Sequence, residues 1–432
     1  MRIQSPDRRT APEIISSDSL KLSEPTAIKL SNKMPLYLFP SPIHEASRLD
    51  IVLEAGSIWQ HKKLTASTTI KMLREGTTRF SGGEISSRID YYGAFLDLQT
   101  TKDTAWISLY AMRKNLHRLL PMVKSMLIEA SFRNRDFNLL NNRQKQSFLV
   151  NSQKPKQLAR NHFNQLLFGA NTPYGQIAES DDFDKLKRDD LIKFYHEKIY
   201  PGQAYAILAG PIDEELKSLI DEFVGFEWRA KGVKNMFKLN ATFKPGYHHI
   251  LRKNSLQSAI VLGKTLMLRS HPDYIPFLLL NTVLGGYFGS RLMTNIRENK
   301  GYTYGINSQV VPMRHATVFM ISTETGSTVT QNAILEIKHE LTRLCEKPIP
   351  EEELQLVKNY LNGSYLRALD GVYNQAERFR SVRDHGLGMQ FYLNSIQRIK
   401  QTTSEELLNL AQKYLDPKSM LTVVVGDENQ KH

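Results

Sequence analysis

Residues 285–308 read GGYFGSRLMTNIRENKGYTYGINS, a glycine-rich stretch followed by an amphipathic one. Glycine adopts backbone angles that other residues resist, so the glycines predict a turn. A helix is expected next, because Leu292 and Ile296 lie one turn apart on the same face. It should begin after Ser290, a favourable N-cap, and end before Gly301, since glycine commonly ends helices. The glycines of the predicted turn are Gly285, Gly286 and Gly289.

Arg297 and Tyr304 are expected to lie on either side of the corner between this helix and a strand over residues 302–311. A guanidinium and a phenol that converge on one point can stabilise a developing oxyanion. Local sequence alone favours plainer alternatives, a solvated helix arginine and a packed strand tyrosine. Phosphate binding by the glycines is a weak interpretation, because the GK[ST] ending of a P-loop is missing.

The composition indicates a globular chain of two or more domains, since 432 residues exceed the usual size of one core. A single cysteine, Cys345, rules out an internal disulfide and is compatible with a reducing compartment. No apolar run reaches membrane-spanning length, and no secretory signal is evident in the first twenty residues. Acidic residues there disfavour a mitochondrial transit peptide, so a bacterial cytoplasmic location is expected.

The net charge of +13 raises the possibility of nucleic-acid binding. Lys and Arg are spread along the chain, however, and lack the clustered stripe of a dedicated nucleic-acid binder. The charge is better explained by a basic surface that meets an acidic partner or substrate.

A repeat divides the chain, because residues 186–212 and 402–428 share a helix, a proline stop, a strand and a terminal glycine. The matched pairs are Leu191 with Leu407, Pro201 with Pro417 and Gly210 with Gly426, all at an offset of 216. This repeat predicts two homologous α+β halves. The expected parts are an N-terminal arm (1–25), a first domain (26–225), a linker (226–245) and a second domain (246–432) that carries Arg297 and Tyr304.

With two duplicated halves and the sequence SRLMTNIRENKGYTYGI at 290–306, the chain resembles the family of pitrilysin, insulin-degrading enzyme and mitochondrial processing peptidase. The resemblance implies, for each half, a mostly antiparallel sheet with helices on one face. In that family an Arg and a Tyr seven residues apart bind substrate and steady the tetrahedral intermediate. Arg297 and Tyr304 match those positions, so in this context the functional interpretation is favoured.

Active members of the family carry H-x-x-E-H on a helix of the first half, with a Glu as third zinc ligand some 76 residues further on. Here the corresponding helix is LTASTTIKMLREGT at 64–77, and no H-x-x-E-H exists anywhere in the chain. Neither the metal nor the general base can be supplied by the residues present. The replaced positions are Ser67 and Lys71 for the two His, Ile70 for the Glu, and Ser147 near the third ligand.

The resemblance then implies a non-catalytic subunit of a heterodimeric zinc peptidase. Such a subunit forms a clam-shell chamber with a homologous partner that has an intact H-x-x-E-H motif and holds the zinc. This chain is expected to bind no cofactor, to contribute Arg297 and Tyr304 in trans, and to contact a peptide substrate. The three glycines, Gly285, Gly286 and Gly289, either shape the entrance of the chamber and contact the substrate or form a simple turn. A homodimer is possible without the partner. The alternatives are a non-enzymatic scaffold, like respiratory-complex core subunits, and, more weakly, nucleic-acid binding; no membrane insertion is expected.

Overall fold

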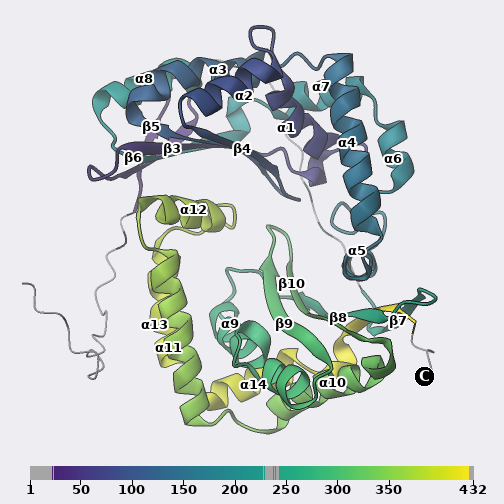
Figure 1. Cartoon of the computed structure of the whole chain (residues 1–432). Helices are drawn as coiled ribbons and strands as arrows, with labels where there is room; N and C mark the ends of the chain where they lie inside the picture. Colours follow the sequence, from purple (N-terminus) through teal and green to yellow (C-terminus); the bar gives the residue numbers. More distant parts are fainter. Residues whose placement is uncertain are drawn as a thin grey trace, which may run out of the picture.

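The computed structural model describes residues 22, 24–226, 228, 237, 239 and 243–427. The predicted arm therefore falls almost entirely outside the described residues, and so does more than half of the predicted linker. Figure 1 shows two layered halves facing each other, each with a sheet toward the centre and helices toward the outside. This arrangement confirms the predicted α+β fold with two sheets.

The first sheet has six strands in the order β1-β2-β6-β3-β5-β4. Only β2 and β6 pair in parallel, and the other neighbours are antiparallel. Strand β3 is buried on both faces, since Ile51 and Val52 belong to two different cores. The strands are β1 (Thr26–Lys29), β2 (Pro35–Pro40), β3 (Ala46–Leu53), β4 (Phe95–Thr100), β5 (Ala105–Met112) and β6 (Ala204–Gly210).

Most helices of the first half cover the outer face of this sheet, and α5 lies apart from them, beside the second sheet (Figure 1). Helix α2 begins at a capping box, in which the Glu84 amide donates to Ser81 Oγ at 3.2 Å and the Ser81 amide donates to Glu84 Oε2 at 2.7 Å. The helices are α1 (Thr65–Glu75), α2 (Gly82–Tyr91), α3 (Leu116–Ile128), α4 (Asn134–Ser152), α5 (Pro155–Phe168), α6 (Ser180–Lys185), α7 (Arg188–Lys198) and α8 (Glu214–Val224).

The second sheet has five strands in the order β7-β11-β8-β10-β9, so β9 is an edge strand. Here too one pair, β7 with β11, is parallel and the others are antiparallel. The strands are β7 (Gly246–Leu251), β8 (Gln257–Leu266), β9 (Thr303–Pro312), β10 (Thr317–Gly326) and β11 (Leu421–Gly426). The helices are α9 (Tyr274–Asn281), α10 (Thr330–Glu346), α11 (Glu351–Ala368), α12 (Val372–Arg383), α13 (Gln390–Gln401) and α14 (Ser404–Tyr414), with two π-helical segments, η4 (Thr282–Gly286) and η5 (Met293–Asn299).

The sequence repeat appears in the structure as matching elements. Helix α7 and helix α14 have the same length and lie 216 residues apart, and each is followed by a proline-initiated turn and a buried strand. The domain boundaries drawn from the repeat stay a prediction.

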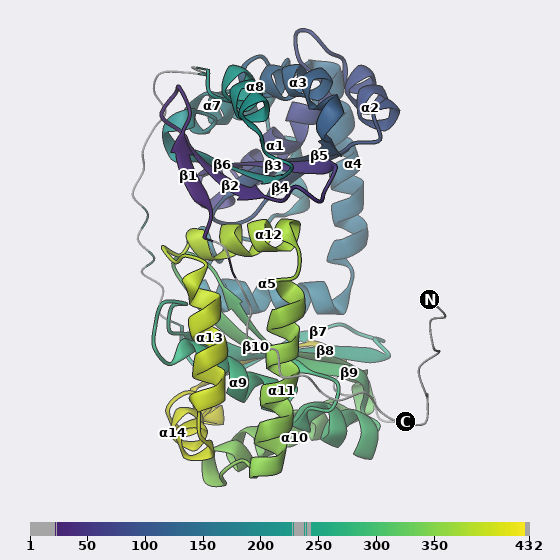
Figure 2. The same ribbon diagram turned by 90° about the vertical axis from the view of Figure 1, so that its left-hand side faces the viewer.

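In each half, one helix packs on the sheet of the other half. Helix α5 of the first half packs on β8 and β11 of the second sheet, where Phe163 is fully buried. Helix α12 of the second half packs on β2 and β6 of the first sheet through Phe379 and its neighbours. Figure 2 shows both helices between the two sheets. The inner face of each sheet is therefore partly covered by a helix from the opposite half.

None of the helices among the described residues has the length and apolarity needed to cross a membrane. The cytoplasmic location stays a prediction.

Candidate functional site

Tyr304 lies in a β-bulge at the start of edge strand β9. Thr303 pairs with Thr325 and Ile306 pairs with Thr323, so two residues, Tyr304 and Gly305, face one residue on β10. A bulge rotates the local side chains away from their regular alternation, and bulges often re-aim residues at functional sites. The Tyr304 side chain is 95% exposed, so the bulge presents its phenol to the space beside the sheet.

Two threonine hydroxyls hold this bulge in place. The Gly305 amide donates to Thr303 Oγ1 at 3.0 Å, and Thr303 Oγ1 donates to the Glu324 carbonyl at 2.7 Å. Thr323 Oγ1 lies 3.0 Å from the Gly305 carbonyl oxygen and 2.9 Å from Thr303 Oγ1. The backbone groups that a bulge would otherwise leave unpaired are thus satisfied by side chains.

Arg297 lies on η5, the π-helical segment that packs against β9. Its guanidinium sits 4.7 Å from the centre of the Phe288 ring, a cation–π contact. Among the described residues no carboxylate pairs with Arg297, and no hydrogen bond joins it to Tyr304. The structure therefore places the two predicted residues on adjacent elements, while their convergence on one substrate atom stays a prediction.

The glycine-rich turn has a packing explanation at one of its three glycines. A Cβ on Gly285 would lie 2.8 Å from the Ser308 backbone nitrogen, so only glycine lets this turn approach β9. Gly286 and Gly289 are exposed, and their predicted contact with substrate is untested. Gly301 ends the helix with a φ of +65°, as expected. The predicted cap is wrong in one respect, because the Ser290 side chain is buried and makes no hydrogen bond within the described part of the chain.

A cavity of about 530 Å³ adjoins Tyr304 on β9. Its walls come from β9, from β10 through Glu324 and Ser322, and from Lys156 at the start of α5. Both halves of the chain therefore contribute to the surroundings of Tyr304. Polar side chains line this space, including the positive charge of Lys156 and the negative charge of Glu324. Such a lining suits the backbone and side chains of a peptide better than an apolar ligand.

The helix that corresponds to the zinc motif, α1, is packed as an ordinary structural helix. Ile70 is fully buried in the main core. Ser67 Oγ donates to the Leu64 carbonyl at 3.2 Å. Lys71 is exposed, and its Nζ donates to Gln144 Oε1 on α4 at 3.2 Å. A lysine, an isoleucine and a serine do not fit zinc, which requires several nitrogen, sulfur or carboxylate donors.

The α4 residue that faces α1 is Gln144, which the sequence analysis missed. Besides its bond to Lys71, Gln144 Nε2 donates to Thr68 Oγ1 at 3.4 Å. Ser147 is exposed and accepts from Asn151 Nδ2, at 3.4 Å, within its own helix. The position opposite α1 is thus Gln144, one helical turn before Ser147. Among the described residues, no group of three or more His, Cys, Asp or Glu side chains is arranged to hold a metal ion.

Two further features were not predicted from the sequence. One is the contact of Phe288 with Arg297, since Phe288 was identified only as part of a glycine-rich turn. The other is the role of Thr323 at the bulge, since Thr323 lies on a different strand from Tyr304. An aromatic residue within a turn does not by itself predict a cation–π contact. Hydroxyl pairs across strands depend on the register of the strands, which the sequence alone does not show.

The comparisons with known proteins agree with this fold. Residues 185–361 match the family model described as peptidase M16 inactive domain. A Helicobacter pylori protein named "Non-peptidase homolog YmxG" is 22% identical over 367 residues, which cover 83% of this chain and 84% of that protein. A Bacillus subtilis protein named "Uncharacterized zinc protease YmxG" is 22% identical over 311 residues, covering 71% of this chain and 75% of that protein. The crystal structure of a peptidase M16 inactive domain from Pseudomonas fluorescens is similar with a TM-score of 0.86 at 20% identity, covering 94% and 99% of the two chains.

Proposed function

Because residues 185–361 match the model of the peptidase M16 inactive domain, we propose that this chain is a peptidase M16 relative that acts as the non-catalytic subunit of a two-subunit zinc peptidase. Its partner would be a homologous chain with an intact H-x-x-E-H motif and the zinc. This chain would supply Arg297 and Tyr304 to the peptide bond that the partner cleaves.

The observation that carries this proposal is the presentation of Tyr304. Its side chain is 95% exposed although it lies within a strand, and a hydrogen-bonded bulge holds it there. A large exposed aromatic residue on a rigid element is suited to contact with another molecule. Nearby Arg297 has a guanidinium that no described carboxylate neutralises, so its charge is available to a substrate.

The chemistry assigned to the pair is hydrogen-bond donation to a carbonyl oxygen that gains negative charge. The Arg297 guanidinium and the Tyr304 hydroxyl are both hydrogen-bond donors, which is what stabilisation of such an oxyanion requires. Removing one such donor typically costs a factor of about 10² to 10³ in turnover. The α1 helix of this chain contributes neither metal nor base, so hydrolysis depends on the partner.

A non-enzymatic scaffold is the second candidate. It is favoured by the structural use of α1, where Ile70 is a core residue and Lys71 bonds to Gln144. In that case Arg297 and Tyr304 would be dispensable, which separates the two candidates.

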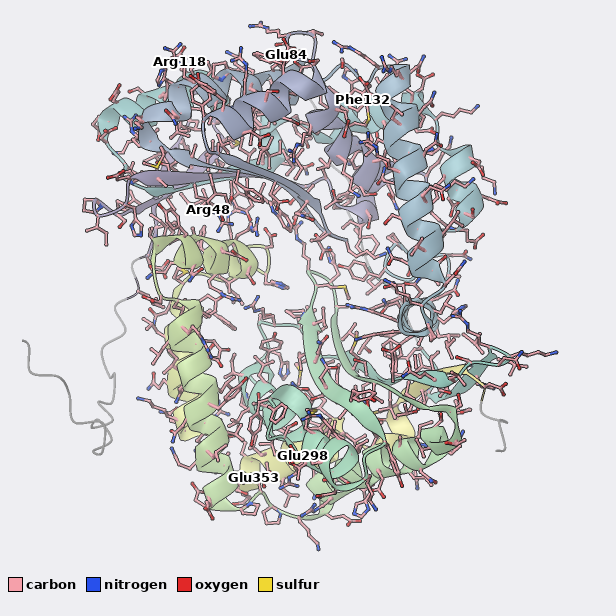
Figure 3. The ribbon with its side chains drawn as sticks, viewed as in Figure 1. Arg48, Glu84, Arg118, Phe132, Glu298 and Glu353 are labelled. Carbon is pink, nitrogen blue, oxygen red and sulfur yellow. The ribbon has the colours of Figure 1, made fainter. Side chains whose placement is uncertain are left out.

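The test is to mix the purified chain with a zinc-bearing M16 homologue from the same genome and to follow the cleavage of a fluorogenic peptide. We expect activity in the mixture only, and its loss on chelation of zinc. Arg297→Ala and Tyr304→Phe should lower turnover without weakening association, as measured by sedimentation. Arg118→Ala is the matched control, because Arg118 lies on the outer helix layer of the first half (Figure 3). Stable association with no peptidase activity would favour the scaffold, and silent changes in an active complex would refute the role in trans.

A further inference from the structure

A cavity of about 420 Å³ lies where the two halves meet. It is enclosed by the turn after β4, by strand β5, by the end of the β9–β10 hairpin and by the exchanged helix α12. Its volume is within the range of roughly 300–1,000 Å³ that is usual for ligand pockets. Apolar surface comes from Trp106 and from residues 311–313, and the remaining walls are polar or charged.

The charged walls carry a surplus of cations, with five Lys or Arg side chains and three Asp or Glu side chains. The acids already have donors. Asp103 accepts from Tyr174 Oη at 2.5 Å and from the Arg314 amide at 3.0 Å. Asp384 accepts from Tyr205 Oη at 2.9 Å, and Glu377 accepts from Arg48 Nη1 at 3.3 Å. In Figure 3 Arg48 extends from the first sheet toward α12.

Arg314 of the same cavity pairs with Glu54 at 3.0 Å, but the other three arginines, Arg269, Arg378 and Arg380, are less well neutralised. Arg380 stacks on Trp106 at 4.0 Å, and its nearest carboxylate oxygen is Asp50 Oδ2, also 4.0 Å away. Asp50 is itself paired with Arg48 at 2.9 Å, so it offers Arg380 little compensation. Arg269 donates to Ser381 and stacks on Phe391 at 4.9 Å. Among the described residues neither Arg269 nor the exposed Arg378 has a hydrogen bond to a carboxylate.

Stacked arginines of this kind are already positioned for an anion. An aromatic face fixes the plane of the guanidinium but leaves its edge free to bind a carboxylate through two parallel hydrogen bonds. In Figure 1 helix α12 and the β9–β10 hairpin face the space between the two sheets. A chain segment that enters this space from the Tyr304 end of β9 would reach the cavity at the other end of the same strand.

We propose that this cavity between the halves binds the carboxylate side chains of an acidic peptide segment. The inference rests on the proposed function in that it places a peptide between the halves, and it deepens that function by naming an acidic class of substrate. Arg269, Arg378 and Arg380 hold the carboxylates, and Trp106 with Met313 contacts the apolar part of the segment. The net charge of +13 adds a long-range attraction for such a peptide.

The test uses the full chain without a partner, so it does not depend on peptidase activity. A fluorescein-labelled peptide of alternating Ala and Glu is compared with the same peptide in which Gln replaces Glu, by fluorescence anisotropy at low salt. We expect the Glu peptide to bind at least about tenfold more tightly, which is about 1.4 kcal/mol. Arg380→Gln should remove most of that preference. Arg378→Gln should also weaken binding, and it provides a second variant because this exposed side chain is not needed for packing.

The controls separate this inference from the proposed function. Arg118→Gln, on the outer layer, should bind as the unmodified chain does. Inorganic phosphate is the competing small anion. Displacement of the peptide only at high phosphate concentration supports a peptide site, whereas phosphate binding without peptide binding overturns it. Equal affinity for the Glu and Gln peptides, or no effect of either cavity variant, also overturns the proposal.

Discussion

Thr303 Oγ1 and Thr323 Oγ1 lie 2.9 Å apart across the β9–β10 pair, beside the bulge that exposes Tyr304. Their hydroxyls satisfy the Gly305 amide and the carbonyls of Gly305 and Glu324. The backbone geometry around the tyrosine therefore depends on two threonine hydroxyls.

Thr323→Val should loosen the bulge. The substitution keeps the shape of the side chain but removes the hydroxyl near Thr303 and the Gly305 carbonyl, so we expect the free energy of unfolding to fall by about 1–3 kcal/mol. Amide hydrogen exchange at Tyr304 and Gly305 should become faster. Ser322→Ala is the matched control, since Ser322 bonds to Asn307 and not to the bulge. Unchanged exchange at Gly305 in the valine variant would contradict this role.

Phe288→Ala should free the Arg297 side chain. The ring lies 4.7 Å from the guanidinium, and a cation–π contact at an exposed site contributes about 0.5–1 kcal/mol. In a complex with an active partner, we expect a two- to fivefold loss of turnover with little change in association. Phe288→Tyr keeps the aromatic face and should retain activity. If the alanine variant turns over as fast as the unmodified chain, the ring does not position Arg297.

Ile70→Glu should destabilise the whole chain instead of restoring catalysis. The side chain is fully buried, and an unpaired carboxylate in a core costs several kcal/mol. Ile70→Val removes one methyl group and should cost only about 0.5–1.5 kcal/mol. Urea unfolding followed by circular dichroism measures both changes. A stable glutamate variant would show that α1 still tolerates the polar residue of the lost motif.

Stability should decline below neutral pH because of His385. Burial, with Arg269 as the second cause, lowers the pKa of this imidazole to about 4, whereas the unfolded value is about 6.5. The unfolded chain therefore binds more protons between these values, so stability present above about pH 6.5 is lost as the pH falls toward 4. His385→Gln should reduce the difference in urea stability between about pH 7.5 and about pH 5. The exposed His61 serves as control, and an equal pH dependence in the His385 variant would exclude this cause.

The sequence predicted the duplicated fold well because its signals are local. The proline turns at Pro201 and Pro417 and the amphipathic helices before them follow from spacing alone. Helices α12 and α13 were not predicted, and α12 has its packing partners in the other half of the chain. No pattern within a helix reveals a partner more than a hundred residues away.

The candidate site was predicted in part for a related reason. Arg297 and Tyr304 were found by their spacing in a resembling motif, and Ile70 and Lys71 by their replacement of metal ligands. Gln144, Thr323 and the π-helical geometry around Arg297 require the structure. Each depends on how two elements align with each other. When that alignment moves by one residue, a different side chain comes to the same place.

Because α5 and α12 each pack on the opposite half, each half requires the other in order to fold. A fragment that ends before α12 would leave Phe39 and Ile207 facing water, and a fragment that begins at β7 would expose the side of β8 and β11 that α5 covers. Neither half is then an autonomous domain, and heat or denaturant should melt both in one transition. Cleavage of the chain between the halves would yield two fragments that aggregate through their exposed apolar faces. They should become soluble again only when they are mixed.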